Sequence, residues 1–175
     1  AGSRLTEVVP AWSQLQAHDR FRIGDVAIEV LHPPLPDWER QRVRNEDSLV
    51  FRLRYRDVEI LLTGDIGAET EHRLQLGDAR AALRILKVAH HGSRSSSSGQ
   101  FLQHYAPHVA LISVGRGNPF GHPAPEVTQR LAAVGAEVFR SDIDGATVIE
   151  TDGRSLTARS MRGRGWTMRV WRTVA

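Results

Sequence analysis

Three apolar stretches, each typical of a buried β-strand, are followed by residues that can bind metal ions or substrate. The stretches are 58–62, 85–88 and 109–114. Asp65 follows the first, His90 and His91 follow the second, and Asn118 and His122 follow the third. Ligands bind outside the carboxyl ends of strands in open α/β sheets. Carboxylate and imidazole together suit Zn, Mn or Fe, so we expect a hydrolytic metal site.

Asp65 is the candidate for a metal ligand shared by two ions. Gly64 lets the backbone turn sharply, so the carboxylate projects past the sheet edge, and one carboxylate can bridge the two ions of a two-metal hydrolase. The alternative is that Asp65 caps the N-terminus of a helix beginning near Ala68.

The pair His90 and His91 is the candidate for catalysis. Adjacent residues of an extended segment point to opposite sides, so at most one imidazole faces a given ion and the other contacts a phosphate or orients a neighbour. Gly92 permits a tight turn, and Ser93 with the following backbone N–H groups can bind an oxyanion of the substrate. The alternative is a histidine pair in a surface loop.

His122 is the second candidate metal ligand. Gly121 and Pro123 flank it and fix the local backbone, and a metal ligand benefits from such rigidity. Asn118, in the same loop, is a candidate substrate contact. The alternative for His122 is a loop histidine without a role. His32 and Asn45 each follow or precede a strand, and each is either a site residue or a turn residue.

Composition restricts the kinds of site that are available. The chain has 175 residues, 41% of them hydrophobic, which fits one globular domain over residues 1–175. It contains no cysteine, so any metal ligand is His, Asp, Glu or Asn. We expect no signal peptide and no membrane helix, because no apolar run approaches about 20 residues.

Positive charge concentrates at the C-terminal end. Six arginines and no acid follow Gly153, and Trp166 and Trp171 lie among them. Such a basic, aromatic segment can hold phosphates and bases, or an anionic membrane surface. We therefore predict a basic tail, 154–175, that binds nucleic acid through Arg162, Arg164, Arg169 and Arg172. The alternative is a solvated, poorly ordered terminus.

Periodicity predicts a mixed α/β domain. Residues 20–31 form two strands, 48–55 and 58–62 form a hairpin, and alternation within 48–55 sets apolar residues on one face and arginines on the other. Helices are expected at 68–76, 99–105 and 125–134, between strands that include 85–88 and 109–114. The strands 138–140 and 147–150 are joined through a turn at 142–145, and a last strand includes Leu156. Strands that alternate with helices predict an α/β fold.

Several motifs, in this order, resemble the metallo-β-lactamase-like domain of the ComEC family of competence DNA-uptake proteins. The motifs are LTGD at 62–65, KVAHHGS at 87–93, SVG at 113–115 and NPFGHP at 118–123. The resemblance covers about residues 20–153. It implies an αββα sandwich and a metal-dependent nuclease that degrades one strand of incoming DNA at the extracytoplasmic face of the cytoplasmic membrane.

The resemblance also assigns roles to residues and partners to the chain. Asp65 is the bridging ligand of two divalent ions, Mn or Zn, and His122 is a ligand of the second. His90 and His91 lie near the scissile phosphate. The implied partners are DNA and a parent protein with a transmembrane channel, of which the present chain is a soluble domain.

One motif of that fold, His-x-His-x-Asp-His, does not occur in this chain. It normally lies in the first half of the sandwich, so we interpret the chain as the C-terminal half. We expect the isolated chain to bind fewer metal ions or none, to be inactive alone, and to need the N-terminal half as a partner. The alternatives are a metal-free DNA-binding or interaction module, and a hydrolase of another phosphodiester such as a teichoic-acid or phosphocholine ester.

Overall fold

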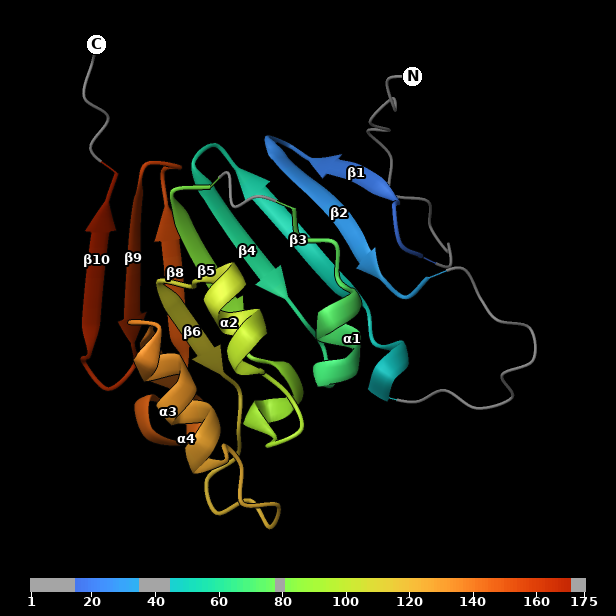
Figure 1. Ribbon diagram of the computed structural model, residues 1–175. Helices are drawn as coiled ribbons and strands as arrows, with labels where there is room; N and C mark the ends of the chain where they lie inside the picture. The colour runs from blue at the N-terminus through green and yellow to red at the C-terminus, as the bar shows by residue number, and fades with distance from the viewer. Residues whose placement is uncertain (1–14, 35–44, 78–80, 171–175) are drawn as a thin grey trace.

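A computed structural model describes residues 15–34, 45–77 and 81–170. The described residues form two β-sheets, with helices against one face of the larger sheet (Figure 1). No helix in these ranges combines the length and apolarity of a membrane span.

The larger sheet has seven strands in the order β1-β2-β3-β4-β5-β6-β7. Its antiparallel part contains β1 (Arg20–Ile23), β2 (Val26–His32), β3 (Val50–Tyr55) and β4 (Val58–Leu62). Its parallel part continues from β4 through β5 (Leu83–Lys87), β6 (Val109–Ile112) and β7 (Glu137–Arg140). The expected hairpin and the strands that follow it are confirmed.

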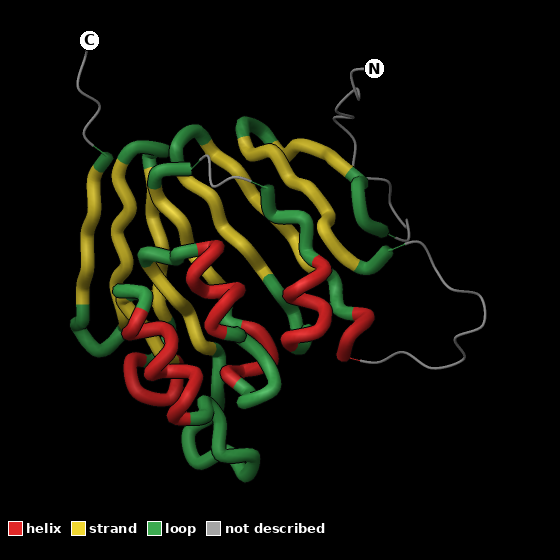
Figure 2. Tube along the Cα trace, in the orientation of Figure 1, coloured by secondary structure: helices red, strands yellow, loops and turns green. Residues whose placement is uncertain are grey.

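The helices are short. Along the chain each follows one of the strands β4 to β7, and in Figure 2 they lie in front of the sheet. They are α1 (Ala68–Arg73), α2 (Gly99–Tyr105), α3 (Pro125–Ala133) and α4 (Ser141–Asp144). Two 3₁₀ turns accompany them, η1 (Asn45–Asp47) and η2 (Ala89–Gly92). α1 ends at Arg73, three residues before the predicted end.

Strand alternation divides the core in two. Leu86 of β5 packs with α2 and α3, whereas its neighbour Ile85 packs with Leu156 and Ala158 of a second sheet. That sheet is antiparallel in the order β10-β9-β8, and its strands are β8 (Thr147–Thr151), β9 (Ser155–Ser160) and β10 (Gly165–Arg169). The described residues therefore form three layers, helices, sheet and sheet, of an α/β protein.

Two predictions near the C-terminus need correction. The strands at 138–140 and 147–150 are not joined by a turn that pairs them, because β7 and β8 lie in different sheets and the short helix α4 connects them. Residues 155–169 form β9 and β10 rather than a loose tail. Leu156 and Ala158 are fully buried, and this burial fixes the segment against the larger sheet.

The alternation within β3 is as predicted, but its inner face is charged. Val50 and Arg52 are the buried residues of the strand, and the Arg52 guanidinium donates to the carbonyl oxygens of Leu76 and Gln75. The apolar face, which includes Leu53 and other half-buried residues, is turned the opposite way.

Candidate active site

The candidate site lies at the carboxyl edge of the parallel strands. Because β4, β5 and β6 are parallel, the segments that follow them leave the sheet at the same edge (Figure 1). These segments carry Asp65, the pair His90 and His91, and His122. The topology thus brings together residues that the sequence separates by up to 57 positions.

Gly64 and Ser48 hold Asp65 at the edge. Gly64 has a φ of +56°, and a Cβ at this residue would lie 2.6 Å from the Ser48 Cβ, so the chain needs glycine here. The backbone N–H of Asp65 donates to the Ser48 hydroxyl at 3.1 Å, and the Asp65 side chain is 39% exposed. The carboxylate is therefore accessible while its backbone is fixed.

Asp65 does not cap α1, so that alternative is wrong. The N-cap of α1 is Gly67, and no side chain at that residue makes the capping bond. The Glu46 carboxylate takes this role from another part of the chain, accepting hydrogen bonds from the Gly67 N–H at 3.0 Å and the Thr70 hydroxyl at 2.5 Å. This leaves Asp65 free for the site and ties η1 to α1.

His90 and His91 lie in a tight turn rather than in the extended segment that we expected. Both belong to η2 and have positive φ angles, +46° and +54°. Residues other than glycine rarely adopt this conformation, and such strain is concentrated at functional sites. The turn is tied to the loop that follows β4 by the His90 N–H, which donates to the Gly64 carbonyl at 3.1 Å. The two imidazoles still have different partners.

His91 faces Asp65. Its Nδ1 lies 2.7 Å from the Ser113 carbonyl oxygen, which can only accept, so Nδ1 carries the proton in the neutral imidazole. The lone pair of Nε2 is then directed toward the Asp65 Oδ2, 3.8 Å away. Two electron-pair donors therefore lie on either side of this gap, an arrangement that suits a shared cation.

His90 faces Asn45 and His122. The Asn45 Nδ2 lies 3.3 Å from the His90 Nε2, and the ring centroids of His90 and His122 are 5.9 Å apart in an edge-on arrangement. Asn45 therefore belongs to the site rather than to a plain turn.

The loop of His122 is closed by Asn118. The Asn118 carboxamide donates to the His122 carbonyl at 2.6 Å and accepts from the His122 N–H at 2.9 Å. This geometry gives Asn118 a role in positioning the loop, and its contact with substrate stays a prediction. The exposed Phe120 ring stacks on His122 with a centroid distance of 6.0 Å.

Burial lowers the pKa of His122, and the charges of His90 and His91 lower it further. A depressed pKa keeps the imidazole neutral near pH 7, as a metal ligand must be. Burial lowers the pKa of Lys87. The Asp65 carboxylate acts in the opposite direction, but the effect of burial is larger. The sequence pattern did not single out Lys87. Its place at the end of β5, paired with Leu62 at the end of β4 just before the loop that carries Asp65, is the signal that identifies it as a neighbour of the site.

The donor set is incomplete for a metal ion. Among residues 15–34, 45–77 and 81–170, no group of three or more His, Asp or Glu side chains is arranged to hold one. Asp65, His91 and His122 offer donor types that suit Zn or Mn at one edge of the sheet.

The remaining predicted residues lie apart from this cluster or have other partners. The Ser93 hydroxyl lies 3.1 Å from the Ser95 hydroxyl within the serine turn. The His32 Nδ1 bonds the Ser48 carbonyl at 3.0 Å, and His32 lines a separate cavity.

The predicted basic segment does not act as a set of equivalent arginines. Arg164 pairs with Glu137 and Asp144 and lies over the Phe139 ring at 4.6 Å, which gives it a structural role. Arg162 is exposed, Arg169 is an exposed residue of β10, and Arg172 lies outside the described residues.

Comparison with known proteins agrees with the resemblance drawn from the motifs. The chain is similar to competence proteins. It is 33% identical over 135 residues to ComE operon protein 3 of Bacillus subtilis, covering 77% of the chain and 17% of that protein. It is 35% identical over 133 residues to competence protein ComA of Neisseria gonorrhoeae, covering 74% and 18%.

A third relative, recombination protein 2 of Haemophilus influenzae, is 34% identical over 104 residues, which cover 59% of the chain and 13% of that protein. The chain thus spans less than a fifth of the length of each of these relatives. No protein-family model matches the chain.

Proposed function

We propose that the chain is part of a metal-dependent DNA nuclease that degrades one strand during DNA uptake in natural competence. The observation that supports this most directly is the meeting of Asp65, His90, His91 and His122 at the carboxyl edge of the sheet. Similarity to competence proteins supports DNA as the substrate.

The proposed roles follow from the contacts of each side chain. Asp65 and His122 contribute part of the ligand set for two divalent ions, Mn or Zn, and ligands from outside this chain complete it. Bound metal ions would supply a hydroxide nucleophile and neutralise charge on the phosphate. His90 can donate a hydrogen bond to a phosphate oxygen, because Asn45 and His122 fix the position of its ring.

An upstream segment is the proposed partner that completes the fold. The half-buried apolar side chains of β3 border an apolar groove of about 330 Å³ between the larger sheet and the second sheet. Within the described residues, β8 pairs with β9 alone and leaves its other edge open. We infer that the N-terminal half of an αββα sandwich covers this face and supplies the remaining ligands.

A location outside the cytoplasmic membrane is likewise proposed, and the length of the relatives supports it. A competence protein more than five times the length of the matched region has room for a transmembrane channel. The present chain would form a domain of it outside the cytoplasmic membrane, where incoming DNA is exposed.

The decisive experiment compares the chain with a version extended upstream, each supplied with Mn or Zn. We expect the extended protein to bind metal and to cleave DNA, and Asp65→Asn to reduce cleavage by about 100-fold or more, as loss of a charge-stabilising group does. Asp25→Asn, in the turn between β1 and β2, is the matched control and should retain activity. An extended protein that binds metal but leaves DNA intact would disprove the proposal.

The incomplete donor set favours one alternative, a metal-free DNA-binding or interaction module. This alternative predicts that the extended protein binds DNA equally well with and without metal, and that Asp65→Asn has no effect on any activity. Metal content measured by mass spectrometry on the purified extended protein separates the two functions.

A further inference from the structure

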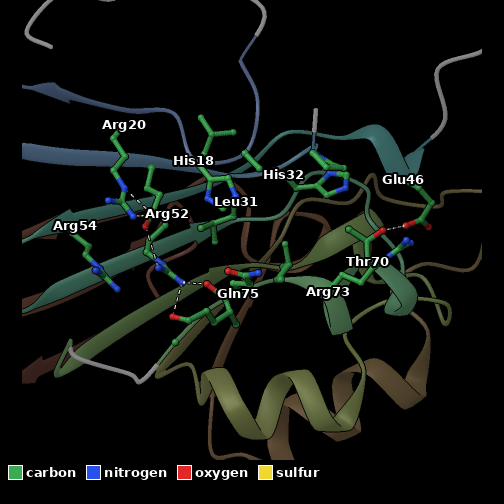
Figure 3. Close-up of a pocket in the computed structure, with 17 residues that line it drawn as sticks. His18, Arg20, Leu31, His32, Glu46, Arg52, Arg54, Thr70, Arg73 and Gln75 are labelled. Atoms are coloured by element: carbon green, nitrogen blue, oxygen red, sulfur yellow. Dashed lines mark hydrogen bonds and ion pairs between the residues drawn. The ribbon is translucent and has the colours of Figure 1, made fainter. Parts of the chain in front are cut away.

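A cavity of about 510 Å³ lies between β2, β3 and the C-terminal end of α1, apart from the histidine cluster (Figure 3). Arg20, Arg52 and Arg54 lie together at one end, and Glu46 and Thr70 lie at the other. The cavity is of the size of ordinary small-molecule sites, roughly 300–1,000 Å³.

Carboxylates hold the three arginines in place. Glu29 accepts from Arg20 at 2.5 Å and from Arg52 at 3.1 Å, and Glu59 accepts from Arg54 at 2.8 Å. Burial works to raise the pKa of Glu29, but the pKa is lowered because Arg20 donates to it and further arginines surround it. Glu29 is therefore an anion that fixes the guanidinium groups.

This end of the cavity retains donors for a ligand. Three guanidinium groups face two carboxylates, and within the described residues the Nη atoms of Arg54 and one Nη atom of Arg20 make no hydrogen bond. Both side chains are partly exposed, 35% for Arg54 and 48% for Arg20. Guanidinium groups fixed in this way suit a phosphate, which they bind through paired N–H groups.

The other walls suit a flat, partly apolar group. Leu31 and the rings of His18 and His32 line the space beyond the arginines (Figure 3), and Leu74 also lines the cavity. The His32 Nδ1 is occupied by the Ser48 carbonyl, which fixes the ring and leaves Nε2 as an acceptor. Nucleobases stack on aromatic and apolar side chains and hydrogen-bond through their edges.

We propose that this cavity binds a nucleoside monophosphate, with the phosphate against Arg20 and Arg54 and the base along the His18 and His32 wall. The cavity and the candidate active site share the 3₁₀ turn η1. Glu46 lines the cavity, whereas the neighbouring Asn45 contacts His90. The ligand is either a nucleotide unit of a bound strand or a free mononucleotide, and both have the same chemistry.

The test is a calorimetric titration of the full chain with dAMP at low ionic strength and without metal. We expect dAMP to bind at least about tenfold more tightly than inorganic phosphate or deoxyadenosine, since only dAMP engages both the arginines and the His18 and His32 wall. Arg20→Gln and Arg54→Gln should each weaken dAMP binding by about tenfold. Arg22→Gln removes the same charge from the same strand, β1, outside the cavity, and should leave the affinity within about twofold.

Competition with a short oligodeoxyadenylate distinguishes the two sources of the ligand. If the oligodeoxyadenylate displaces dAMP from the unchanged chain but does not bind Arg20→Gln, the ligand is a unit of a strand. If dAMP binds and the oligonucleotide does not displace it, the ligand is a free mononucleotide. The proposal is overturned if dAMP binds no better than phosphate, or if Arg20→Gln and Arg22→Gln weaken binding equally. Because no metal or cleavage enters this titration, its result does not depend on whether the nuclease proposal holds.

Discussion

At the residue scale, partners decide what each charged side chain can do. The Nδ1 of His91 donates a hydrogen bond to the Ser113 carbonyl, so its Nε2, the ring nitrogen nearest to Asp65, carries the lone pair. Glu71 is buried and accepts from the Ser98 N–H at 2.9 Å, which gives it a structural role next to α2. Similar residue types thus serve either the site or the scaffold, according to the contacts that surround them.

Arg162 and Arg164 provide a test at this scale, because of the two only Arg164 has ion-pair partners among the described residues, Glu137 and Asp144. Arg164→Gln should reduce the free energy of unfolding by about 1 kcal/mol, since Asp144 loses a partner while remaining buried. Arg162→Gln should leave stability unchanged. If the exposed arginine contacts DNA, this variant lowers the slope of log affinity against log salt by about 1.

Urea unfolding and salt-dependent DNA binding measure the two effects. Equal loss of DNA affinity in both variants, with no change in unfolding, would show that Arg164 is free in solution.

At the scale of elements, η2 and the loop of His122 are held against one another. Gly92 has a φ of +82°, and its carbonyl accepts from the Ala124 N–H at 2.8 Å. A Cβ at Gly92 would lie 2.6 Å from the Pro123 Cβ. This close approach brings His90 and His122 together, so the glycine is part of the site geometry.

Gly92→Ala should therefore separate the two elements. We expect a loss of about 2–3 kcal/mol in the free energy of unfolding, combining backbone strain with the clash. Gly121→Ala is the matched control, because Gly121 also has a positive φ, +68°, but nothing lies within 4 Å of its Cβ position. It should lose only about 1 kcal/mol.

Unfolding curves and the imidazole NMR signals of His90 and His122 provide the readout. Identical losses and unchanged histidine signals in both variants would show that the contact with Pro123 is unimportant.

At the scale of the whole molecule, the larger sheet is covered unequally. Helices cover the side of Leu86, and the second sheet covers the side of Ile85. The apolar groove lined by Leu53 and Tyr55 lies beside the second sheet. An uncovered apolar face of this kind marks an interaction surface, and the proposed N-terminal half is its occupant.

Leu53→Lys tests this assignment. In the version extended upstream, the variant should reduce the free energy of unfolding by about 2 kcal/mol, because a charge is buried at the junction of the halves. In the chain alone, the change should stay within about 0.5 kcal/mol. Met161→Lys, at a residue that is 79% exposed, should have little effect in either protein.

Chemical denaturation of the four variants measures this difference. A penalty for Leu53→Lys that is the same in both proteins would exclude this face as the junction.

The succession of strands along the chain as far as residue 140, and the location of Asp65, His90, His91 and His122 just after strand ends, were predictable from sequence. Alternation and strand-end position are local patterns, and parallel strands bring their carboxyl ends to one edge whatever lies between them. The conformation of the histidine turn was not predictable, because contacts with Gly64 and Pro123 impose its positive φ angles.

Only the tertiary structure shows which charged side chains are bonded within the fold. Glu46 caps α1 from 21 residues away, Arg52 bonds Leu76 from 24 away, and Arg164 pairs with Glu137 from 27 away. Such partners leave no periodic signal in the chain, since each depends on how distant elements pack. The arginine cavity is formed by side chains from β1, β2, β3 and the α1 region, so it too cannot be recognised before these elements are packed together.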